Sequence, residues 1–454
     1  MNTTSASISV QSPKRRIRNF NEVVLGFSKR AALEEARRCP QCSQPECMAA
    51  CPLGINIPLF IRYLREGHID GAYRQISEAN PFAGICGRVC HAPCEAKCIL
   101  QQEGAPMSIR ALERFAYDHG HKKELKRPAE KTSAKKVAVI GSGPCGLTAA
   151  SRLAREHFEV TVFESLPAAG GFLRYGIPEM RLPQAVLEKE IAALKRLGVH
   201  IQEHKFMCDL DLAGLTAQGY VAVILAAGYG GISLPPLQGV FYERVYLVEE
   251  ILLQHNFLRK DIFEREMLKK VGERVVVIGG NDKAWDAARL CRRLGREAMV
   301  VFPGPQEDLP FHHLEMEQGQ EEGVELKALT KPMEILADSQ GRAVGIRCLN
   351  MDYADVRGDG PWRLIPVPGS DFVLEADTVI LAEGQNDRGV FAKVFPGIDL
   401  NAQVQGTVPP SRVTAKKDVF VVGSMNEDGL SLVAAMQRGK AIAQTVVRHL
   451  TEKK

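Results

Sequence analysis

The sequence lacks the features that mark membrane-spanning, secreted and nucleic-acid-binding proteins. It contains no run of about 18 apolar residues, the length that a membrane-spanning helix needs. The first twenty residues are polar and basic without an apolar stretch, so we expect a flexible arm and no secretory signal. The net charge is only +4, and no basic stripe alternates with aromatic residues. The sequence therefore gives no support to nucleic-acid binding.

The overall composition is that of a globular protein with a large core. Of the 454 residues, 45% are hydrophobic and 25% are charged, a balance typical of soluble proteins. A chain of this length predicts about two to four domains.

The twelve cysteines are concentrated near the N-terminus, where eight fall within residues 39–98. Such a block at the head of a long chain indicates a metal site in a reducing cytoplasm rather than a disulfide scaffold. The block consists of Cys39, Cys42, Cys47, Cys51, Cys86, Cys90, Cys94 and Cys98. Zinc sites usually use paired C-x-x-C motifs, and here one such motif occurs. The run from Cys39 to Cys51-Pro52 is similar to that of two-cluster ferredoxins and predicts two [4Fe–4S] clusters, with Cys86 as either a ligand or a buried structural thiol.

The order of sequence patterns predicts an α/β protein: an N-terminal α-helical, ferredoxin-like domain followed by two Rossmann-type dinucleotide-binding domains, the second inserted in the first. Helical spacing dominates the first part, and two strand–glycine turn–helix–strand units follow it. The expected boundaries are a flexible arm at 1–22, a helical [4Fe–4S] domain at 23–125, a linker at 126–136, the first dinucleotide domain at 137–240 and 375–454, and the second at 241–374.

The first dinucleotide unit has the strand, glycine turn and helix that a pyrophosphate site requires. Gly141, Gly143 and Gly146 follow the strand VAVI and open the helix LTAASRLA. Their lack of side chains allows a tight turn and a close backbone approach, and the helix N-terminus faces the pyrophosphate. Glu164 ends the next strand, where an acid can bind ribose hydroxyls. Cys145 is interpreted as a small residue that fills the loop.

The second unit departs from this pattern at its most sensitive position. In VVVIGGNDKAWDAARL, residues 275–290, Gly279, Gly280 and Ala284 are in place, but Asn281 replaces the glycine of closest approach. Its Cβ and amide would crowd a pyrophosphate, and Asp282 would compete for the same N–H groups. Three interpretations stay open: a working NAD(H) site, another use, or an empty scaffold. Trp285 is expected in the core rather than at a pocket mouth.

The chain resembles the small (beta) subunit of NADPH-dependent glutamate synthase and its relatives. The resemblance rests on the two glycine units, a closing VFVVGS and the segments CPQCSQPECMAACPLG, GRVCHAPCEAKC and GGFLRYGIPEMRLP. The resemblance runs from about residue 20 to the C-terminus. It implies a helical domain with two [4Fe–4S] clusters, FAD on the first dinucleotide unit and NAD(P)H on the second. It also implies that electrons leave singly to a redox partner subunit or a ferredoxin-like protein within a hetero-oligomer.

Carried over by position, the resemblance assigns ligands to both clusters. Cys39, Cys42 and Cys47 would bind one cluster, and Cys51, Cys90, Cys94 and Cys98 the other. A side-chain oxygen would complete the first set, and Glu113 is the expected donor; its alternative is a solvated helix face or an ion pair with Arg110 or Arg114. The expected cofactor-binding residues are Gly141, Gly143, Gly146, Glu164, Gly171, Tyr175, Ile177, Arg181, Gly228, Gly279, Gly280, Asn281, Ala284, Gly384, Gly423 and Ser424. Tyr175 and Arg181 have ordinary loop packing as their alternative, and Ser424 stands where the family usually has aspartate.

The resemblance also bears on which nucleotide is used. NADPH-using relatives place paired arginines after the strand AMVVF, whereas this chain has Phe302-Pro-Gly-Pro305. Without a guanidinium fork for the 2′-phosphate, NADH is favoured over NADPH.

The expected function is that of a flavin and iron–sulfur oxidoreductase subunit. The alternatives are a relay subunit with a degenerate nucleotide site and a colourless zinc protein. The basic residues 14–18 are expected to be a solvated tail or to contact an acidic partner.

Overall fold

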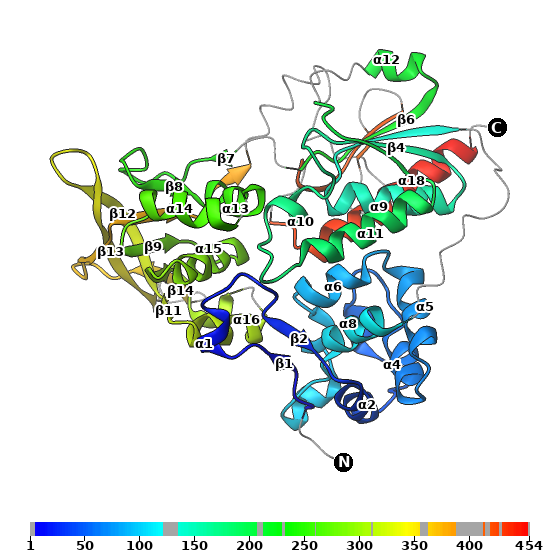
Figure 1. Cartoon of the computed structure of the whole chain (residues 1–454), viewed down its shortest axis with the longest axis horizontal. Coiled ribbons are helices and arrows are strands. Elements are labelled where there is room, and N and C mark those ends of the chain that lie inside the picture. Colours follow the sequence, from blue (N-terminus) through cyan, green and yellow to red (C-terminus); the bar gives the residue numbers. More distant parts are fainter. Residues whose placement is uncertain are drawn as a thin grey trace.

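The computed structural model describes most of the chain and divides it into a helical domain and two α/β domains (Figure 1). The described residues are 5–120, 135–206, 212–228, 232–258, 260–309, 312–354, 362–386, 412–413, 418–425 and 429–452. The predicted linker at 126–136 lies outside them except for its last two residues. The predicted fold class, a helical domain followed by two Rossmann-type domains, is confirmed.

The helical domain is made of short helices, two of which begin at a polar side-chain cap. Ser28 accepts a hydrogen bond from the N–H of Ala31, and Asn56 accepts one from the N–H of Leu59. The helices are α2 (Lys29–Arg38), α3 (Glu46–Ala50), α4 (Ile57–Arg65), α5 (Ile69–Ala79), α6 (Ala83–Val89), α7 (Pro93–Ala96), η1 (Ile99–Glu103) and α8 (Ile109–His119). Helix α3 packs against α7, so the two cysteine-rich segments lie side by side.

The N-terminal arm is docked on the rest of the protein, and the flexible arm predicted for residues 1–22 is wrong for the described part of that segment. Strand β1 (Ser9–Val10) pairs antiparallel with β2 (Val24–Gly26), and α1 (Pro13–Arg16) lies between them. The Arg16 side chain is buried, and its Nε donates a 2.8 Å hydrogen bond to Glu322 of the second α/β domain. The basic segment 14–18 is therefore not wholly a solvated tail.

Replacing Arg16 by alanine should destabilise the protein, because a buried carboxylate would lose a partner. Burial alone would raise the pKa of Glu322, but Arg289 and Arg293 hold this pKa well below its usual range. We expect the free energy of unfolding to fall by about 2 to 3 kcal/mol, measured by chemical denaturation. The matched control is Arg15→Ala at the exposed neighbouring residue, with an expected change below about 0.5 kcal/mol. Equal stability of the two variants would contradict the docked arm.

The first α/β domain is built on a mainly parallel sheet with helices on both faces. In the described part of the chain its six strands run in the order β18–β19–β6–β3–β4–β5. The strands are β3 (Lys136–Ile140), β4 (Glu159–Phe163), β5 (His200–Gln202), β6 (Tyr220–Leu225), β18 (Arg412–Val413) and β19 (Val419–Val421). The helices are α9 (Pro144–Arg155), α10 (Phe172–Tyr175), α11 (Gln184–Arg196), α12 (Leu212–Ala217), η4 (Gly423–Met425) and α18 (Leu432–Glu452). Helices α9, α11 and α18 pack toward the helical domain (Figure 1).

The second α/β domain has a parallel sheet of its own. Its five described strands run in the order β11–β10–β9–β16–β8. They are β8 (Val245–Leu247), β9 (Arg274–Ile278), β10 (Glu297–Val301), β11 (Val324–Lys327) and β16 (Thr378–Leu381). Its helices are α13 (Val248–Phe257), α14 (Lys260–Lys270), α15 (Asp282–Arg293), η3 (Gln306–Asp308) and α16 (His313–Glu321).

Strand β16 corrects the predicted domain boundary. The segment DTVILAEGQ was assigned to the first domain by the boundary at 374/375, but β16 pairs with β8 and β9 of the second. All four residues of β16 are buried, as in a central parallel strand of either sheet. The apolar pattern therefore could not distinguish the two sheets. The second domain extends through β16, and its insertion within the first is confirmed by the sheet order.

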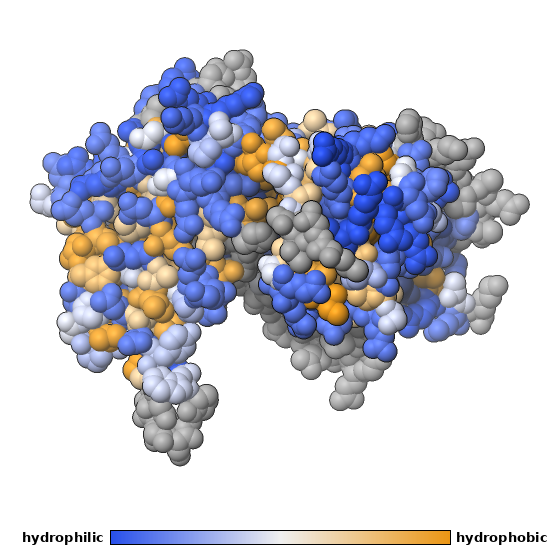
Figure 2. All heavy atoms as spheres, turned by 90° about the horizontal axis from the view of Figure 1, so that it is seen from below, coloured by the Kyte–Doolittle hydropathy of each residue, from blue (hydrophilic) through white to orange (hydrophobic). Residues whose placement is uncertain are grey.

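Short paired strands connect the two α/β domains, and a smaller sheet extends the second. β7 (Ile232–Ser233) pairs antiparallel with β17 (Gln385–Asn386) where the chain crosses between the domains. The added antiparallel sheet contains β12 (Thr330–Ala337), β13 (Ala343–Ala354), β14 (Arg363–Pro366) and β15 (Phe372–Glu375). Figure 2 shows apolar side chains gathered over this part of the surface, where the exposed residues include Val344, Tyr353, Trp362 and Val373. None of the described helices is long and apolar enough to cross a membrane.

Candidate functional site

The structure gathers Cys39, Cys42, Cys47 and Cys98 into a first thiol group. Cys39 ends α2, Cys47 lies in α3, and Cys98 follows α7, which packs against α3. Burial raises the pKa of Cys47 to about 11, and the nearby thiolates of Cys98, Cys39 and Cys42 add to the rise. Cys98 also lies close enough to Cys39 to raise its pKa. The prediction that Cys98 joins Cys51, Cys90 and Cys94 is therefore wrong.

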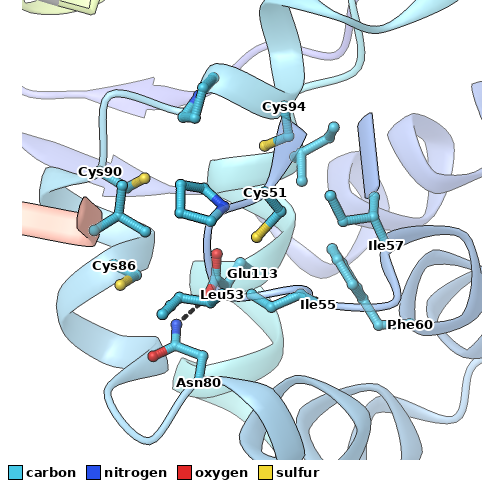
Figure 3. A pocket seen from close by; sticks show the side chains of 14 residues that line it. Cys51, Leu53, Ile55, Ile57, Phe60, Asn80, Cys86, Cys90, Cys94 and Glu113 are labelled. Atoms are coloured by element: carbon cyan, nitrogen blue, oxygen red, sulfur yellow. Dashed lines mark hydrogen bonds between the residues drawn. The ribbon is translucent and has the colours of Figure 1, made fainter. Parts of the chain in front are cut away.

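Cys51, Cys90 and Cys94 form a second thiol group around a small cavity (Figure 3). Burial raises the pKa of Cys90 to about 12, and Glu113 and Cys51 are among the charges that add to it. Burial likewise raises the pKa of Cys51, with Glu113 again adding to the rise. The second group is therefore three thiols with one carboxyl.

Glu113 belongs to the second group and not to the first, which corrects its predicted place. It lines the cavity from α8 and is 7% exposed. Asn80 donates a 2.7 Å hydrogen bond to Oε1 of Glu113, and burial raises the pKa of Glu113 to about 8. Arg110 instead pairs with Glu315, and Arg114 pairs with Glu22 and Asp118. The alternatives of a solvated helix face or an ion pair with either arginine are therefore wrong.

Cys86 lies in the wall of the same cavity and is 2% exposed. Its Sγ lies 3.5 Å from Sδ of Met436, a residue of α18 in the first α/β domain. Burial raises the pKa of Cys86 far above its ordinary value, and the nearby charges of Glu113 and Cys90 add to the rise. Both interpretations of Cys86, ligand and structural thiol, are compatible with this position.

The donors around the thiol groups fit iron–sulfur clusters better than a single metal ion. Among the described residues, no group of three or more His, Cys, Asp or Glu side chains is arranged to hold one metal ion. Main-chain N–H groups face the sulfurs: Ala92 donates to Cys90 at 3.3 Å, and Leu53, Gly54 and Ile55 counter the effect of burial on Cys51. Such N–H donors are typical of cluster-binding loops and tune the reduction potential.

The first glycine turn has the geometry of a dinucleotide loop. Gly141 has φ +105°, and a Cβ there would lie 2.4 Å from the carbonyl oxygen of Ala226. A Cβ at Gly146 would lie 2.1 Å from the carbonyl oxygen of Gly141, so both glycines are required by the turn itself. Gly143 is the N-cap of α9, and no other described atom lies within 4 Å of a Cβ built there. The open space beside Gly143, at a helix N-terminus, fits a pyrophosphate.

Glu164 holds this loop in place from the end of β4. Its Oε2 accepts hydrogen bonds from the N–H and hydroxyl of Ser142, at 3.0 and 2.5 Å. Its Oε1 accepts from the N–H of Leu166 at 2.8 Å. Gly171, with φ +50°, approaches the same loop, because a Cβ there would lie 2.9 Å from Cα of Gly143. Glu164 therefore fixes the shape of the expected flavin site through these hydrogen bonds, in addition to the ribose contact that the sequence predicts.

The predicted flavin-edge residues divide between the two α/β domains. The Tyr175 hydroxyl accepts from the N–H of Ala168, and its ring stacks on Phe257 of α13 with centroids 4.6 Å apart. Ile177 is buried in the first domain. Arg181 forms ion pairs with three acids of the second domain, Asp282, Asp286 and Glu315. The expectation that Arg181 binds the flavin is corrected by this arrangement, since its guanidinium links the domains.

The remaining residues predicted for the first site lie at the ends of its strands. Gly423, with φ +83°, follows β19, and a Cβ there would lie 3.4 Å from Sγ of Cys145 in the first glycine turn. Ser424 follows it in η4. Gly228, with φ +78°, follows β6 in the same sheet. Gly384, by contrast, follows β16 of the second sheet.

In the second glycine turn Asn281 occupies the position equivalent to Gly143. It is the N-cap of α15: its Oδ1 accepts from the N–H of Ala284 at 3.1 Å, and its Nδ2 donates to the carbonyl of Ala382 at 2.7 Å. Ala284 is buried. The asparagine amide thus uses one helix N–H that a pyrophosphate would need.

Other side chains also surround this turn. A Cβ at Gly280 would lie 2.2 Å from the Phe302 ring, and one at Gly279 would lie 3.2 Å from Cγ of Glu383. Asp282, rather than facing a phosphate, pairs with His91 of the helical domain at 2.6 Å. The turn is therefore surrounded by an aromatic ring, two carboxyl groups and an imidazole.

Two further side chains near this turn have partners outside any nucleotide site. Lys283 pairs with Glu249 at 2.5 Å. Trp285 is 2% exposed, and its Nε1 donates to the carbonyl of Glu315 at 2.8 Å, so its predicted place in the core is confirmed.

Comparison with known proteins identifies the family. Residues 16–125 match the model described as dihydropyrimidine dehydrogenase domain II, 4Fe-4S cluster, and residues 135–439 match pyridine nucleotide-disulphide oxidoreductase. A glutamate synthase [NADPH] small chain of Mycobacterium tuberculosis is 31% identical, covering 96% of this chain and 93% of its own. The chain belongs to the glutamate synthase small-chain family. It is thus an FAD and iron–sulfur oxidoreductase with a [4Fe–4S] domain, as predicted.

Other relatives of this chain are subunits of different redox proteins. The NADP(+)-dependent formate dehydrogenase subunit beta of Moorella thermoacetica is 31% identical over 89% of this chain. The chain spans 60% of the length of that relative. Among solved structures, Mycobacterium tuberculosis FprA in complex with NADPH has a TM-score of 0.56 at 17% identity, covering 70% of this chain and 85% of its own. That likeness concerns the fold.

Several residues beside the thiol groups and the second glycine turn lie outside any motif that the sequence shows. Asn80 bonds Glu113 from 33 residues away, and His91 bonds Asp282 from 191 residues away. Lys440 of α18 donates to the carbonyl of Leu53 in the second thiol group's loop. The sequence offers no local signal for such pairs, because each is formed by packing between elements distant along the chain.

Proposed function

We propose that the chain transfers electrons between its flavin and a partner redox subunit through both thiol groups, in the order flavin, second group, first group. The supporting observation is that α18, which follows the closing flavin motif, contributes Val433 to the cavity of the second thiol group. Bound FAD would exchange an electron pair with a nucleotide, while the clusters would carry single electrons. The protein's side chains would hold these groups in that order, with α18 between the flavin site and the second thiol group.

We assign the first cluster to Cys39, Cys42, Cys47 and Cys98, and the second to Cys51, Cys90, Cys94 and Glu113. The support for Glu113 is a buried carboxyl that faces three thiols and has Asn80 as a hydrogen-bond partner. The flavin is assigned to the turn at Gly141, Gly143 and Gly146 with Glu164, Gly171 and Gly423. The open space beside Gly143 is what supports this placement.

We further propose a protein partner that takes electrons from or gives them to the first thiol group. Relatives are named as subunits, and Met48 and Ile99, the neighbours of Cys47 and Cys98, are exposed large apolar residues. Exposed apolar side chains of this kind mark interaction surfaces when they cluster. The described cysteines are free thiols, which supports a reducing cytoplasm as the compartment.

For the second dinucleotide domain we propose NADH rather than NADPH as the nucleotide. Phe302 to Pro305 provide no guanidinium for a 2′-phosphate, whereas NADP-type sites use such cations. The competing proposal is a relay subunit whose nucleotide domain serves as scaffold. Asn281 on the helix N-terminus, the Phe302 ring on Gly280 and the nearby Glu383 favour this second candidate.

Anaerobic titration of the purified protein with each nucleotide should separate these proposals. We expect NADH to bleach the flavin absorbance and NADPH to bleach it at least about tenfold less effectively, because the 2′-phosphate lacks a cationic partner. Bleaching by NADPH at equal concentration would contradict the proposed preference. If neither nucleotide bleaches the flavin while dithionite does, the relay proposal is correct. Asn281→Gly, a change that costs a cap only a few tenths of a kcal/mol, should then restore part of the nucleotide binding.

A further inference from the structure

One face of α18 connects the flavin domain with the loop of the second thiol group. Val433 lines the cavity, Met436 contacts Cys86, and Nζ of Lys440 donates a 2.8 Å hydrogen bond to the main-chain carbonyl of Leu53. The spacings of three and four residues place these three side chains on the same side of the helix. Figure 3 shows the loop of Cys51 and Leu53 beside this cavity. Lys440 is thus a cation of the flavin domain set on the loop that carries Cys51.

The carbonyl of Leu53 belongs to a peptide group whose N–H, that of Gly54, is hydrogen-bonded to Cys51. This N–H donates a 3.0 Å hydrogen bond to the main-chain carbonyl of Cys51, and it also counters the effect of burial on the pKa of the Cys51 thiol. A hydrogen bond donated to a carbonyl polarises its peptide group and strengthens the N–H as a donor. Lys440 therefore acts on Cys51 through this peptide and through its own charge, which is partly shielded from solvent.

We propose that Lys440 is a positioning residue that raises the reduction potential at the second thiol group and so favours electron transfer out of the flavin domain. This inference rests on the proposed assignment of Cys51, Cys90 and Cys94 to a cluster. Positive charge and N–H donors near the sulfurs stabilise the site when it holds one more electron, because that electron adds negative charge. No bond is made or broken, and Lys440 keeps its protons throughout.

The test is a redox titration of the anaerobically purified holoprotein, followed by electron paramagnetic resonance. At the potential where the wild-type second cluster is half reduced, the ratio of reduced to oxidised cluster in Lys440→Gln should be roughly tenfold lower, equivalent to about 59 mV for a one-electron couple. Lys440→Arg should stay near the wild-type value. The matched control is Lys135→Gln, because Lys135 also donates to a main-chain carbonyl, that of Leu450 at the far end of α18.

The outcomes separate this inference from the proposed function. Equal midpoint potentials for wild type, Lys440→Gln and Lys440→Met, with both clusters present, would overturn the role of Lys440. Absence of a second cluster from the wild-type protein would overturn the assignment on which it rests. If Lys440→Gln loses its cluster altogether, Lys440→Met and Lys440→Arg decide the matter, since a charge effect requires arginine to rescue the potential and methionine to fail. The same potential shift in Lys135→Gln would show a general effect of domain stability and contradict the inference.

Discussion

Replacing Cys98 by serine should remove one cluster and leave the flavin and the second cluster in place. Cys98 lies with Cys39, Cys42 and Cys47, so the hydroxyl would replace one thiolate of the first set. Serine is a far weaker ligand for iron than the soft cysteine thiolate. We expect the iron content of the purified protein to fall from about eight to about four atoms per chain. Iron analysis and electron paramagnetic resonance of the dithionite-reduced protein measure this change.

Two control variants make the result specific to the grouping. Glu113→Ala should change the resonance signal that survives in the Cys98→Ser variant, because Glu113 faces Cys51, Cys90 and Cys94. Cys348→Ser, at a buried thiol of the added sheet, should leave iron and both signals unchanged. If Cys98→Ser and Glu113→Ala abolished the same signal, the assignment of Cys98 and Glu113 to different clusters would be wrong.

Replacing Gly143 by valine should abolish flavin binding without unfolding the first α/β domain. The residue has φ −68° and ψ 179°, a conformation open to residues with side chains, and no other described atom lies within 4 Å of the new Cβ. The side chain would instead occupy the space that the pyrophosphate requires. We expect FAD affinity to fall at least about tenfold, measured as flavin content per chain and by titration of the flavin-free protein.

The neighbouring glycine provides the contrast for this experiment. Gly146→Val should reduce the yield of folded protein, because its Cβ would lie 2.1 Å from the carbonyl oxygen of Gly141. Gly143→Val, in comparison, should retain its circular dichroism spectrum and its iron. A Gly143→Val protein with full flavin content would show that the cofactor lies elsewhere.

Local patterns in the sequence were sufficient for the fold class, for iron–sulfur clusters and for nucleotide binding, whereas FAD was implied by the family resemblance. The glycine turns were recognisable because a β–α turn around a pyrophosphate restricts residues that are close in sequence, as at Gly141 and Gly146. The cysteine block was recognisable because cluster ligands recur at short spacings. The expected place of Trp285, in the core rather than at a pocket mouth, is also confirmed.

Features formed between distant segments could not be read from such patterns. Cys98 follows Cys94 by four residues, yet α7 turns it toward Cys39 and Cys47. Strand β16 is an apolar stretch that either sheet could bury, and its pairing with β8 and β9 decides its domain. Arg181 lies within a family motif for the flavin edge, but its charge is satisfied by acids of the second domain.

The sequence by itself therefore determined a helical cluster domain, two dinucleotide folds and an unusual asparagine in the second. Only the tertiary structure decided which thiols share a group, that Glu113 faces the second of them, and that Asn281 caps a helix whose next residue pairs with His91. The physical reason is the range of the interactions concerned. Turn geometry and periodicity act over a few residues, whereas ligand sets and buried ion pairs depend on how whole elements pack against one another.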